Sequence, residues 1–431
     1  MMTAWAPREV DQVAELRRLA AELEGRLSEA SIPVAERAEA LGEVCRRWRD
    51  PASRFRRAIV SSLVEEAGLA PATAAAGFDA SLRAWSPGAW RALAARLPGI
   101  DGVGREPWVG VVPHILGSAL PAPHVLPIFF TLLAGGAALA RAGRHAPSLP
   151  AIAVAALADV DPRLALRAAV RRWPRDRADL TRALFDGARV GTATGGDAAA
   201  AAIRSLVGRD TRLLAHPHRV SFAYVGASAL VARAGTSAAE RLAEDVALHD
   251  QQGCLSPVGA LVEGGRRAAL RFADQLAAGL ADRQGVWPRA ALDPAAALSV
   301  RAFHDAFAVV AAERRDARVL AGDGLAWVVG VPGAGGGPPP FAPLGRCLWV
   351  AAVTGAAQAR RTVGRWRGAT ASLGVAGNAS ERRGARALAN WLGAWRLAPV
   401  GRMQSPPLAW RQDGARPLLD LLPEPALEPV A

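Results

Sequence analysis

Cys254 is the residue of this chain whose type and surroundings best suit covalent chemistry. It lies in the stretch His-Asp-Gln-Gln-Gly-Cys-Leu-Ser-Pro, residues 249–257, among small and polar neighbours rather than in an apolar stripe. Apolar spacing predicts a helix over 239–248, and a strand is expected over 258–262. A cysteine on a turn between two regular elements is both held and accessible. It is therefore either a reactive nucleophile or an ordinary loop cysteine.

The other cysteines and the histidines near this stretch suggest no metal site. Cys45 and Cys347 form no CxxC pair with each other or with the loop cysteine, so neither a disulfide framework nor a zinc cluster is expected, and a reducing compartment fits. His216 and His218 have no carboxylate or cysteine beside them and are candidates for proton supply. His249 either influences thiolate formation or is a surface or capping residue.

Two Gly-Gly turns occur where a phosphate-bearing cofactor would be held, at residues 135–136 and 195–196. The second follows a predicted strand over 188–193 and precedes a predicted helix over 198–207. A further strand is predicted over 108–116, and strands that alternate with helices indicate an open, mainly parallel sheet. Glycine turns at helix N-termini hold dinucleotide phosphates in such sheets. Neither turn has the GxGxxG pattern, so each is either a phosphate turn or an ordinary helix start.

The composition indicates a globular protein of two or three domains. The 431 residues are 51% hydrophobic and 21% charged. The formal net charge of +13 favours acidic partners. The basic residues look scattered along the chain, with short clusters at 171–172, 314–315, 360–361 and 382–383. Aromatic residues do not interleave with these clusters in the sequence, so nucleic-acid binding is not expected.

The helices expected near the N-terminus have no chemical motif. Amphipathic segments over 10–27, 33–48, 52–67 and 72–97 predict a helical packing region. Residues 118–140 carry no formal charge and are long enough to span a bilayer. Their three prolines and one Gly-Gly pair favour a buried strand–turn–helix unit instead. Residues 1–12 lack the apolar core of a signal peptide, and we expect a cytoplasmic protein without integral membrane insertion.

Taken together, these motifs resemble the LuxC-type acyl-CoA reductases, a branch of the aldehyde dehydrogenase superfamily. The resemblance rests on Asp-Gln-Gln-Gly-Cys-Leu-Ser-Pro at 250–257 and on Pro-Val-Gly-Arg-Met at 399–403. Residues 111–135, residues 219–223, Trp410, Asp413 and Gly414 add support. The likeness covers roughly 102–422, and the residues before it match only in being helical.

The resemblance implies an α/β protein of the aldehyde dehydrogenase type, with two Rossmann-like parallel-sheet domains and a helical N-terminal region. The expected divisions are a helical region at 1–101, a dinucleotide-binding domain at 102–230, a catalytic domain with the cysteine loop at 231–400 and a C-terminal return segment at 401–431. Self-association into a homo-oligomer is expected from the same resemblance.

The implied activity is the NADPH-dependent reduction of a fatty acyl thioester to an aldehyde. The acyl donor would be acyl-CoA or an acyl carrier protein, and Cys254 would carry the acyl group as a covalent intermediate. The pKa of Cys254 is expected to be lowered, because the thiolate is the nucleophile. Two alternatives stay open: an acyl-transfer protein that uses Cys254 without hydride transfer, and a non-catalytic scaffold that docks an acidic carrier protein.

The resemblance also assigns roles to residues outside the cysteine loop. Ala119 falls where the superfamily has an oxyanion-binding asparagine, and Ser118 is the candidate substitute. Leu214 falls near the position of the glutamate that activates water in aldehyde oxidation, and this difference agrees with a thioester reductase. Trp410 and Asp413 are expected to be structural.

The implied cofactor residues lie in two turns. Arg141 falls where the superfamily has a lysine that reaches the adenosine ribose. With Arg144 and His145 alongside, it favours NADPH over NADH, although a solvated basic turn would look the same. Residues Thr194, Gly195 and Gly196 fall at the turn that meets the cofactor's phosphates, or form a plain helix start.

Overall fold

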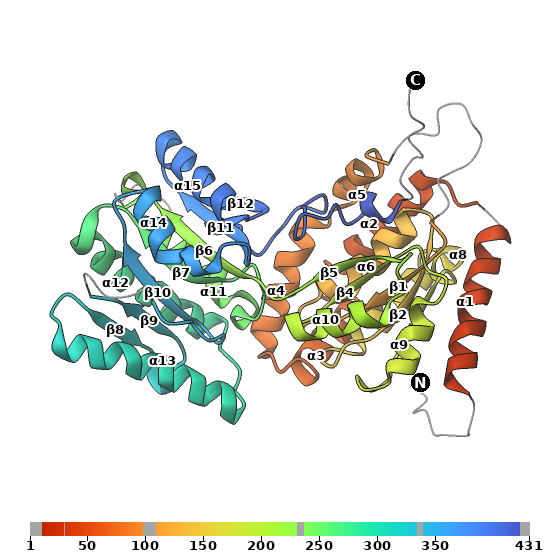
Figure 1. The fold of residues 1–431 in the computed structure, drawn as a ribbon, viewed down its shortest axis with the longest axis horizontal. Helices are drawn as coiled ribbons and strands as arrows, with labels where there is room; N and C mark the ends of the chain where they lie inside the picture. Colours follow the sequence, from red (N-terminus) through yellow and green to blue (C-terminus); the bar gives the residue numbers. More distant parts are fainter. Residues whose placement is uncertain (1–10, 30, 98–108, 231–236, 334–338, 423–431) are drawn as a thin grey trace. The chain divides into compact units, whose positions relative to one another are not determined.

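The chain folds into two compact units, each built around one sheet (Figure 1). The first unit comprises residues 1–59, 85–217 and 415–431, and the second comprises 60–84 and 218–414. The functional domain boundaries expected from the sequence stay predictions within this division. The computed structural model describes residues 11–29, 31–97, 109–230, 237–333 and 339–422. The start of the strand predicted over 108–116 lies outside the described residues.

The sheet of the first unit has five parallel strands in the order β3-β2-β1-β4-β5. Chain order runs outward from β1 to β3 on one side and then crosses to β4 on the other, so the direction of winding changes between β1 and β4. Ligands of open α/β sheets bind at the carboxyl edge of such a switch point. The strands are β1 Val111–Ile115, β2 Ala137–Arg141, β3 Ala168–Arg171, β4 Val190–Thr194 and β5 Arg212–His216.

Helices cover both faces of this sheet. Side chains of α1, α9 and α10 pack on one face, with Leu139 and Ala193 of the sheet among their partners. On the other face the Trp48 ring stacks on Phe129 of α6, with ring centroids 5.9 Å apart. The helices are α1 Gln12–Glu29, α2 Val34–Arg47, α5 Pro87–Ala94, α6 Ala122–Leu133, α7 Leu149–Ala158, α8 Pro162–Ala165, α9 Ala178–Phe185 and α10 Asp197–Leu206.

The uncharged stretch 118–140 forms α6, a turn and β2. The predicted burial is confirmed, since eight of the helix's residues are buried, but the predicted order of strand, turn and helix is wrong. Pro121 and Pro123 favour a helix start here rather than a strand. Among the described residues, one helix is long and apolar enough to span a membrane by length and composition, and it is α13, Pro294–Glu313.

The amphipathic segment 72–97 is not one helix. Ser86 and Pro87 divide it, because the Ser86 hydroxyl accepts the backbone N–H of Ala89 at 3.1 Å and Pro87 occupies the first helical position. The two halves belong to different units: α4, Pro71–Ala84, is part of the second, and α5 is part of the first. Helix α3, Arg54–Glu65, contains the boundary between residues 59 and 60.

The second unit has a seven-stranded sheet in the order β12-β11-β6-β7-β10-β9-β8, in which only β8 pairs antiparallel. Strands β6 and β7 are buried along their whole length, as expected for central strands covered on both faces. The strands are β6 Val220–Val225, β7 Pro257–Val262, β8 Arg318–Ala321, β9 Val328–Val331, β10 Cys347–Ala352, β11 Thr370–Ala376 and β12 Arg396–Pro399.

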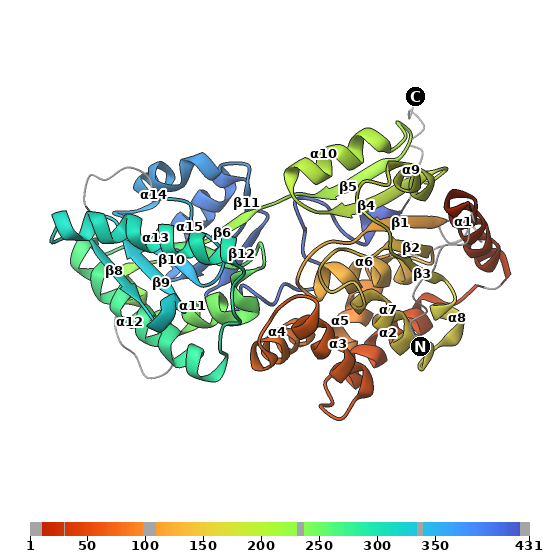
Figure 2. The same cartoon turned by 90° about the horizontal axis from the view of Figure 1, so that it is seen from below.

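Two separate apolar clusters lie on the two faces of this sheet. Helices α11, Ala238–Ala247, and α12, Gly265–Val286, form one cluster with Val262 and Val350. Helices α13, α14, Ala356–Val363, and α15, Ala379–Leu392, form the other with Trp349 and Leu373. Figure 2 shows α12 and α13 on opposite sides of β8 and β9.

Candidate active site

The cysteine loop connects α11 to β7 at the amino edge of the second sheet. A capping box of Ser237 and Glu240 starts the helix, an irregular turn follows at Leu248–Gln251, and Cys254 lies three residues before β7. Cys254 is partly exposed. The hydroxyl of Ser221 in β6 donates to its backbone oxygen at 2.7 Å. The predicted position, on a turn between a helix and a strand, is confirmed.

Three consecutive residues before the cysteine adopt left-handed backbone conformations. The φ angles are 57° for His249, 51° for Asp250 and 61° for Gln251. Such conformations cost a non-glycine residue on the order of 1–3 kcal/mol each when they are strained, so the surrounding contacts must hold them. The motif before the cysteine therefore encodes a backbone shape, and its buried side chains provide the contacts.

Gln251 joins the loop to two strands. Its side-chain nitrogen donates to the backbone oxygens of Pro257 at 2.8 Å and Cys347 at 2.7 Å. Its side-chain oxygen accepts the backbone N–H of Cys347 at 2.7 Å. The amide is fully buried and thus fixes the loop against the starts of β7 and β10.

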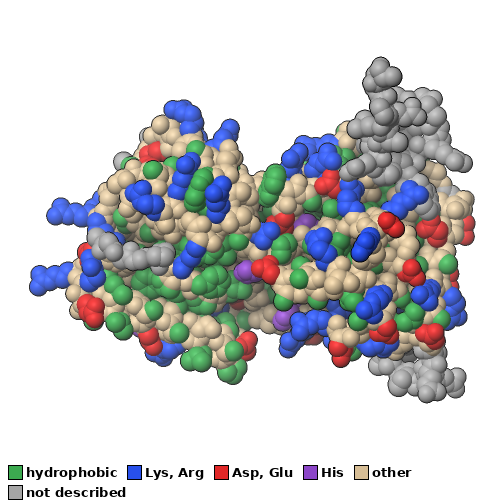
Figure 3. Space-filling model, viewed as in Figure 1, with side chains coloured by type: hydrophobic (Ala, Val, Ile, Leu, Met, Phe, Trp, Pro, Cys, Tyr) green, Lys and Arg blue, Asp and Glu red, His purple; other side chains and the backbone are tan. Residues whose placement is uncertain are grey.

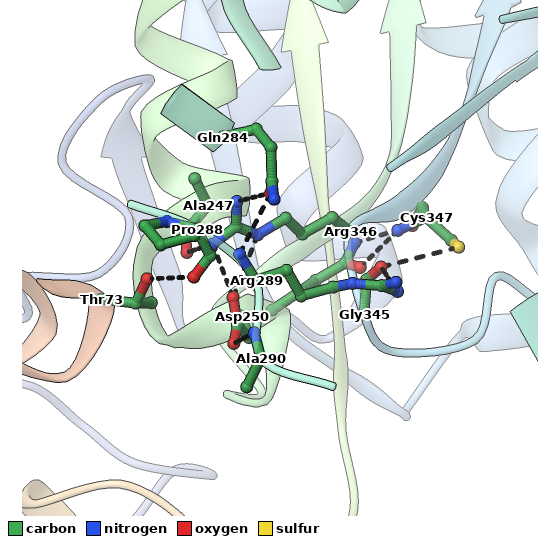
Figure 4. Close-up of polar contacts among 11 residues, drawn as sticks. Thr73, Ala247, Asp250, Gln284, Pro288, Arg289, Ala290, Gly345, Arg346 and Cys347 are labelled. Carbon is green, nitrogen blue, oxygen red and sulfur yellow. Dashed lines mark hydrogen bonds and ion pairs between the residues drawn. The ribbon is translucent and has the colours of Figure 1, made fainter. Parts of the chain in front are cut away.

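Asp250 forms a buried ion pair with Arg346 (Figure 4). Its carboxylate accepts from Arg346 Nη2 at 2.6 Å and Nε at 3.0 Å, and from the backbone N–H of Ala290 at 3.3 Å. Arg346 also donates to Gln284 Oε1 at 2.9 Å. Burial raises the pKa of Asp250 and lowers that of Arg346, while their attraction opposes both shifts. The pair holds the strained turn to the segment that precedes β10.

Asp245 attaches the C-terminal motif to the same loop. Its carboxylate accepts the backbone N–H groups of Gly401 at 2.5 Å and Met403 at 2.9 Å. The side-chain nitrogen of Gln404 donates to the Asp245 backbone oxygen at 2.9 Å and to Ser256 Oγ at 2.8 Å. Burial raises the pKa of Asp245 to about 7. The two most specific sequence motifs of the chain are therefore packed together around one carboxylate.

The charges near Cys254 act in opposite directions. Burial raises the pKa of the thiol to about 12, and the carboxylate of Asp413 adds to the rise, while the cysteine's own backbone N–H, Arg219 and Arg396 lower it. Arg219 and Asp413 are themselves an ion pair at 3.4 Å. The prediction of a lowered thiol pKa is therefore wrong for this structure, because desolvation and a carboxylate outweigh the two cations.

The side chain of His249 is buried in the second unit. It is buried against α4, where a Cβ added to Gly77 would lie 2.3 Å from its Nδ1. That nitrogen has no hydrogen-bond partner among the described residues. Burial lowers the pKa of His249 to about 4, so the ring is neutral at physiological pH. No described hydrogen bond or ion pair joins it to Cys254, and a catalytic role for His249 stays a prediction.

The predicted cofactor residues and the oxyanion candidate Ser118 lie at the carboxyl edge of the first sheet. Ser118 follows β1, Arg141 ends β2 and Thr194 ends β4. The strand ends approach one another closely: a Cβ on Gly117 would lie 2.6 Å from the backbone oxygen of Thr194, and one on Gly143 would lie 2.6 Å from that of Leu116. The sequence did not single out these two glycines, although their contacts bring the backbone together at the switch point.

The individual side chains at this edge already have partners. Ser118 Oγ accepts the backbone N–H of Leu120 at 3.0 Å. Arg141 donates from Nε and Nη2 to the backbone oxygen of Trp173 at 3.3 and 3.1 Å, and burial lowers its pKa. Arg144 is exposed, as is His145.

The phosphate turn predicted at 194–196 has the expected local form. Gly195 donates its backbone N–H to the His216 oxygen at 3.2 Å. Gly196 precedes the ten-residue helix α10 without a side-chain cap. The start of a helix on the switch point is suited to a pyrophosphate.

The buried His114 connects β1 to its neighbours in the first unit. Its Nδ1 lies 2.8 Å from Thr192 Oγ1 and its Nε2 lies 2.9 Å from Thr131 Oγ1, so it joins β1 to β4 and α6. Burial lowers its pKa to about 3, which keeps the ring neutral. Sequence reasoning missed this residue, and its place in the Val-Val-Pro-His-Ile segment was the available signal.

Comparisons with known proteins agree with the expected family and fold. The sequence matches the family described as acyl-CoA reductase (LuxC) over residues 104–423. A search of curated proteins found no significant match.

Solved aldehyde dehydrogenases have similar structures. One is an NAD-dependent benzaldehyde dehydrogenase from Corynebacterium glutamicum, with 14% identity, 91% of this chain and 88% of that chain covered, and a TM-score of 0.66. Another is an NAD-dependent aldehyde dehydrogenase from Sinorhizobium meliloti, with 18% identity, 93% and 80% covered, and a TM-score of 0.67. At these identities the likeness establishes the fold, and the predicted aldehyde dehydrogenase-like α/β architecture is confirmed.

Proposed function

Because the chain belongs to the acyl-CoA reductase (LuxC) family, we propose that it reduces a fatty acyl thioester to an aldehyde through an acyl group held on Cys254. Family and fold support an oxidoreductase of this class. The observation that carries the finer assignment is a partly exposed cysteine on a strained, heavily anchored turn. A loop cysteine without a role would need no such support.

The proposed reaction begins with the Cys254 thiolate. Its sulfur attacks the thioester carbonyl, a new carbon–sulfur bond forms, and the carrier thiol leaves when the tetrahedral adduct collapses. Arg219 and Arg396 stabilise the thiolate, and the Cys254 backbone N–H is a candidate donor for the developing oxyanion. The role of Ser118 as a substitute oxyanion donor stays a prediction from the resemblance.

The first unit supplies a place that fits a dinucleotide. Its switch point combines closely approaching strand ends with the uncapped start of α10 at Gly195 and Gly196. We assign the pyrophosphate to Thr194–Gly196 and the adenosine side to Arg141 and Arg144. The exposed cation of Arg144 favours a 2′-phosphate, and therefore NADPH. A bound reduced nicotinamide supplies the hydride.

An assay of NADPH oxidation with a panel of acyl-CoA and acyl-carrier thioesters tests the proposal. We expect aldehyde as the product, identified by mass, and loss of turnover in Cys254→Ala. Cys45→Ala, which removes a fully buried thiol of the first unit, is the matched control and should retain activity. Full turnover by Cys254→Ala, or none by the intact protein, contradicts the proposal.

A second candidate function is acyl transfer without reduction. Two observations favour it: Ala119 stands where an oxyanion donor is expected, and the thiol has a raised pKa. In that case mass spectrometry would find an acyl adduct on Cys254 that NADPH does not discharge. Calorimetry would then find no NADPH binding.

A further inference from the structure

The positive charge of the chain is concentrated near its C-terminal end. Residues 324–412 contain eleven arginines and a single acidic residue, Glu381, so this part carries +10 of the net +13. The prediction that the basic residues are scattered is therefore wrong for residues 324–412. A local excess of one sign produces a field that attracts partners of the opposite sign.

Seven of these arginines belong to α14, α15 and the turn after α14, and we call them the α14–α15 basic surface. All but Arg360 are exposed, and in the described part of the chain none forms an ion pair with a carboxylate. Figure 3 shows basic side chains gathered over this part of the second unit. The members are Arg360, Arg361, Arg365, Arg367, Arg382, Arg383 and Arg386.

The acidic residue of this segment does not neutralise the surface. The Glu381 carboxylate caps its own helix, accepting the backbone N–H of Asn378 at 2.7 Å and that of Ser228 at 2.9 Å. These hydrogen bonds lower the pKa of Glu381, although burial opposes them. The basic surface is thus left without an internal counterion on α15.

Tryptophan rings hold several of the cations in place. The guanidinium of Arg365 lies 4.1 Å from the Trp366 ring centroid, and those of Arg360 and Arg367 lie 5.6 and 5.2 Å from that of Trp391. Basic and aromatic residues therefore do interleave in space, contrary to the expectation from the sequence. Since Trp366 is only 7% exposed and both rings are in contact with arginines, they present held cations rather than open faces for stacking bases.

One end of the basic surface, at Arg367, lies at the sheet edge that carries the thiol. Cys254 lies three residues before β7, and Arg367 lies three residues before β11. Strands β7, β6 and β11 are parallel neighbours, with Ser221 of β6 opposite both Pro257 and Ser372. Their amino ends therefore meet at one edge of the second unit.

We propose that the α14–α15 basic surface docks an acidic acyl carrier protein, which delivers its thioester to Cys254. The inference rests on the proposed function, because it concerns the donor of the same acyl group. The arginines of α15 all lie within its first eight residues, and those of α14 and the turn after it extend the surface over a second helix. A group of seven cations spread over two helices exceeds what the phosphates of one coenzyme A need, and it suits the face of a folded acidic protein.

Charge reversal at two members without described partners tests the docking. In the Cys254→Ala background, we expect Arg361→Glu/Arg386→Glu to weaken binding of a fluorescently labelled holo acyl carrier protein at least tenfold in an anisotropy titration. In the active protein, the same pair should raise KM for the acyl-carrier thioester at least tenfold and leave KM for the matching acyl-CoA within about twofold. Arg267→Glu/Arg271→Glu, on the exposed side of α12 across the sheet, makes the same charge change and should alter neither.

Several outcomes would overturn the docking. One is an equal loss with acyl-CoA, which would assign the surface to the coenzyme's phosphates. The docking is also overturned if the charge-reversed protein binds the carrier as tightly as the parent does. It is overturned as well if the parent binds anionic vesicles or RNA but no carrier. If the carrier binds and the charge-reversed pair weakens that binding, while neither thioester is reduced, the docking stands and the proposed reduction fails.

Discussion

The two candidate sites are built in opposite ways. The edge of the first sheet takes its form from backbone, through glycines that let strand ends approach, such as Gly117 and Gly143. The cysteine loop of the second unit takes its form from buried side chains that reach it from distant segments, such as Arg346 and Asp245. Changes to the first edge should therefore affect cofactor affinity, whereas changes around the loop should affect folding and thiol chemistry.

The largest effect is expected where the loop depends on a buried charge. Arg346→Met leaves Asp250 buried without its cation, which should lower the free energy of unfolding by about 3–5 kcal/mol. Arg318→Met removes an exposed partner of Asp274 in the same unit and should cost at most about 1 kcal/mol. Urea unfolding measures both, and equal losses would show that the loop does not depend on this pair.

The raised pKa of Asp245 predicts a pH-dependent stability. Its pKa is about 7 in the folded chain against 3.8 ordinarily, so between these values the folded state holds a proton that the unfolded state has lost. This carboxyl group therefore makes stability fall as pH rises from about 4 to 7. Between pH 5 and 7 the parent should lose about 2 kcal/mol more than Asp245→Asn. If the free energy of unfolding of the two proteins changes equally with pH, the raised pKa of Asp245 is excluded.

Crowding the edge of the first sheet should weaken cofactor binding and leave the thiol of the second unit unchanged. A Cβ at Gly143 meets backbone that cannot yield easily, so Gly143→Ala should weaken NADPH binding by about 1–3 kcal/mol. Gly25→Ala, where a Cβ meets nothing within 4 Å, is the control. Calorimetry measures the affinity, and the rate of Cys254 alkylation should stay unchanged in both. Altered alkylation in Gly143→Ala would show that the substitution also disturbs the cysteine loop of the second unit.

The smallest effect concerns the ion pair beside the thiol. Asp413→Asn removes an anion that raises the pKa of Cys254, so iodoacetamide alkylation at pH 8 should become about tenfold faster. Arg219→Gln removes a cation and should slow alkylation by a similar factor. The pH profile of alkylation distinguishes an electrostatic role from a structural one. The profile of Asp413→Asn should shift to lower pH and that of Arg219→Gln to higher pH. A shift in one direction for both variants would refute the assignment.

Local sequence was enough for much of the fold and for the position of the cysteine. Apolar periodicity predicted the helix before Cys254 and the strand after it, and the glycine turn after β4 was predicted from residue types alone. These features depend on residues adjacent in the chain, whose conformational preferences act over one or two turns of backbone. The break at Ser86-Pro87 was within reach of the same reasoning, because both residues favour a helix start.

The environment of the thiol required the folded chain. Asp413 is 159 positions from Cys254, and the loop is held by Arg346 and Gln404, which are also remote in sequence. Desolvation depends on what packs around a group, so neither the raised pKa of Cys254 nor the burial of His249 was visible in the residues beside them. Residue types and spacing identified the nucleophile candidate, whereas packing between distant segments set its acidity, its anchors and the charges that surround it.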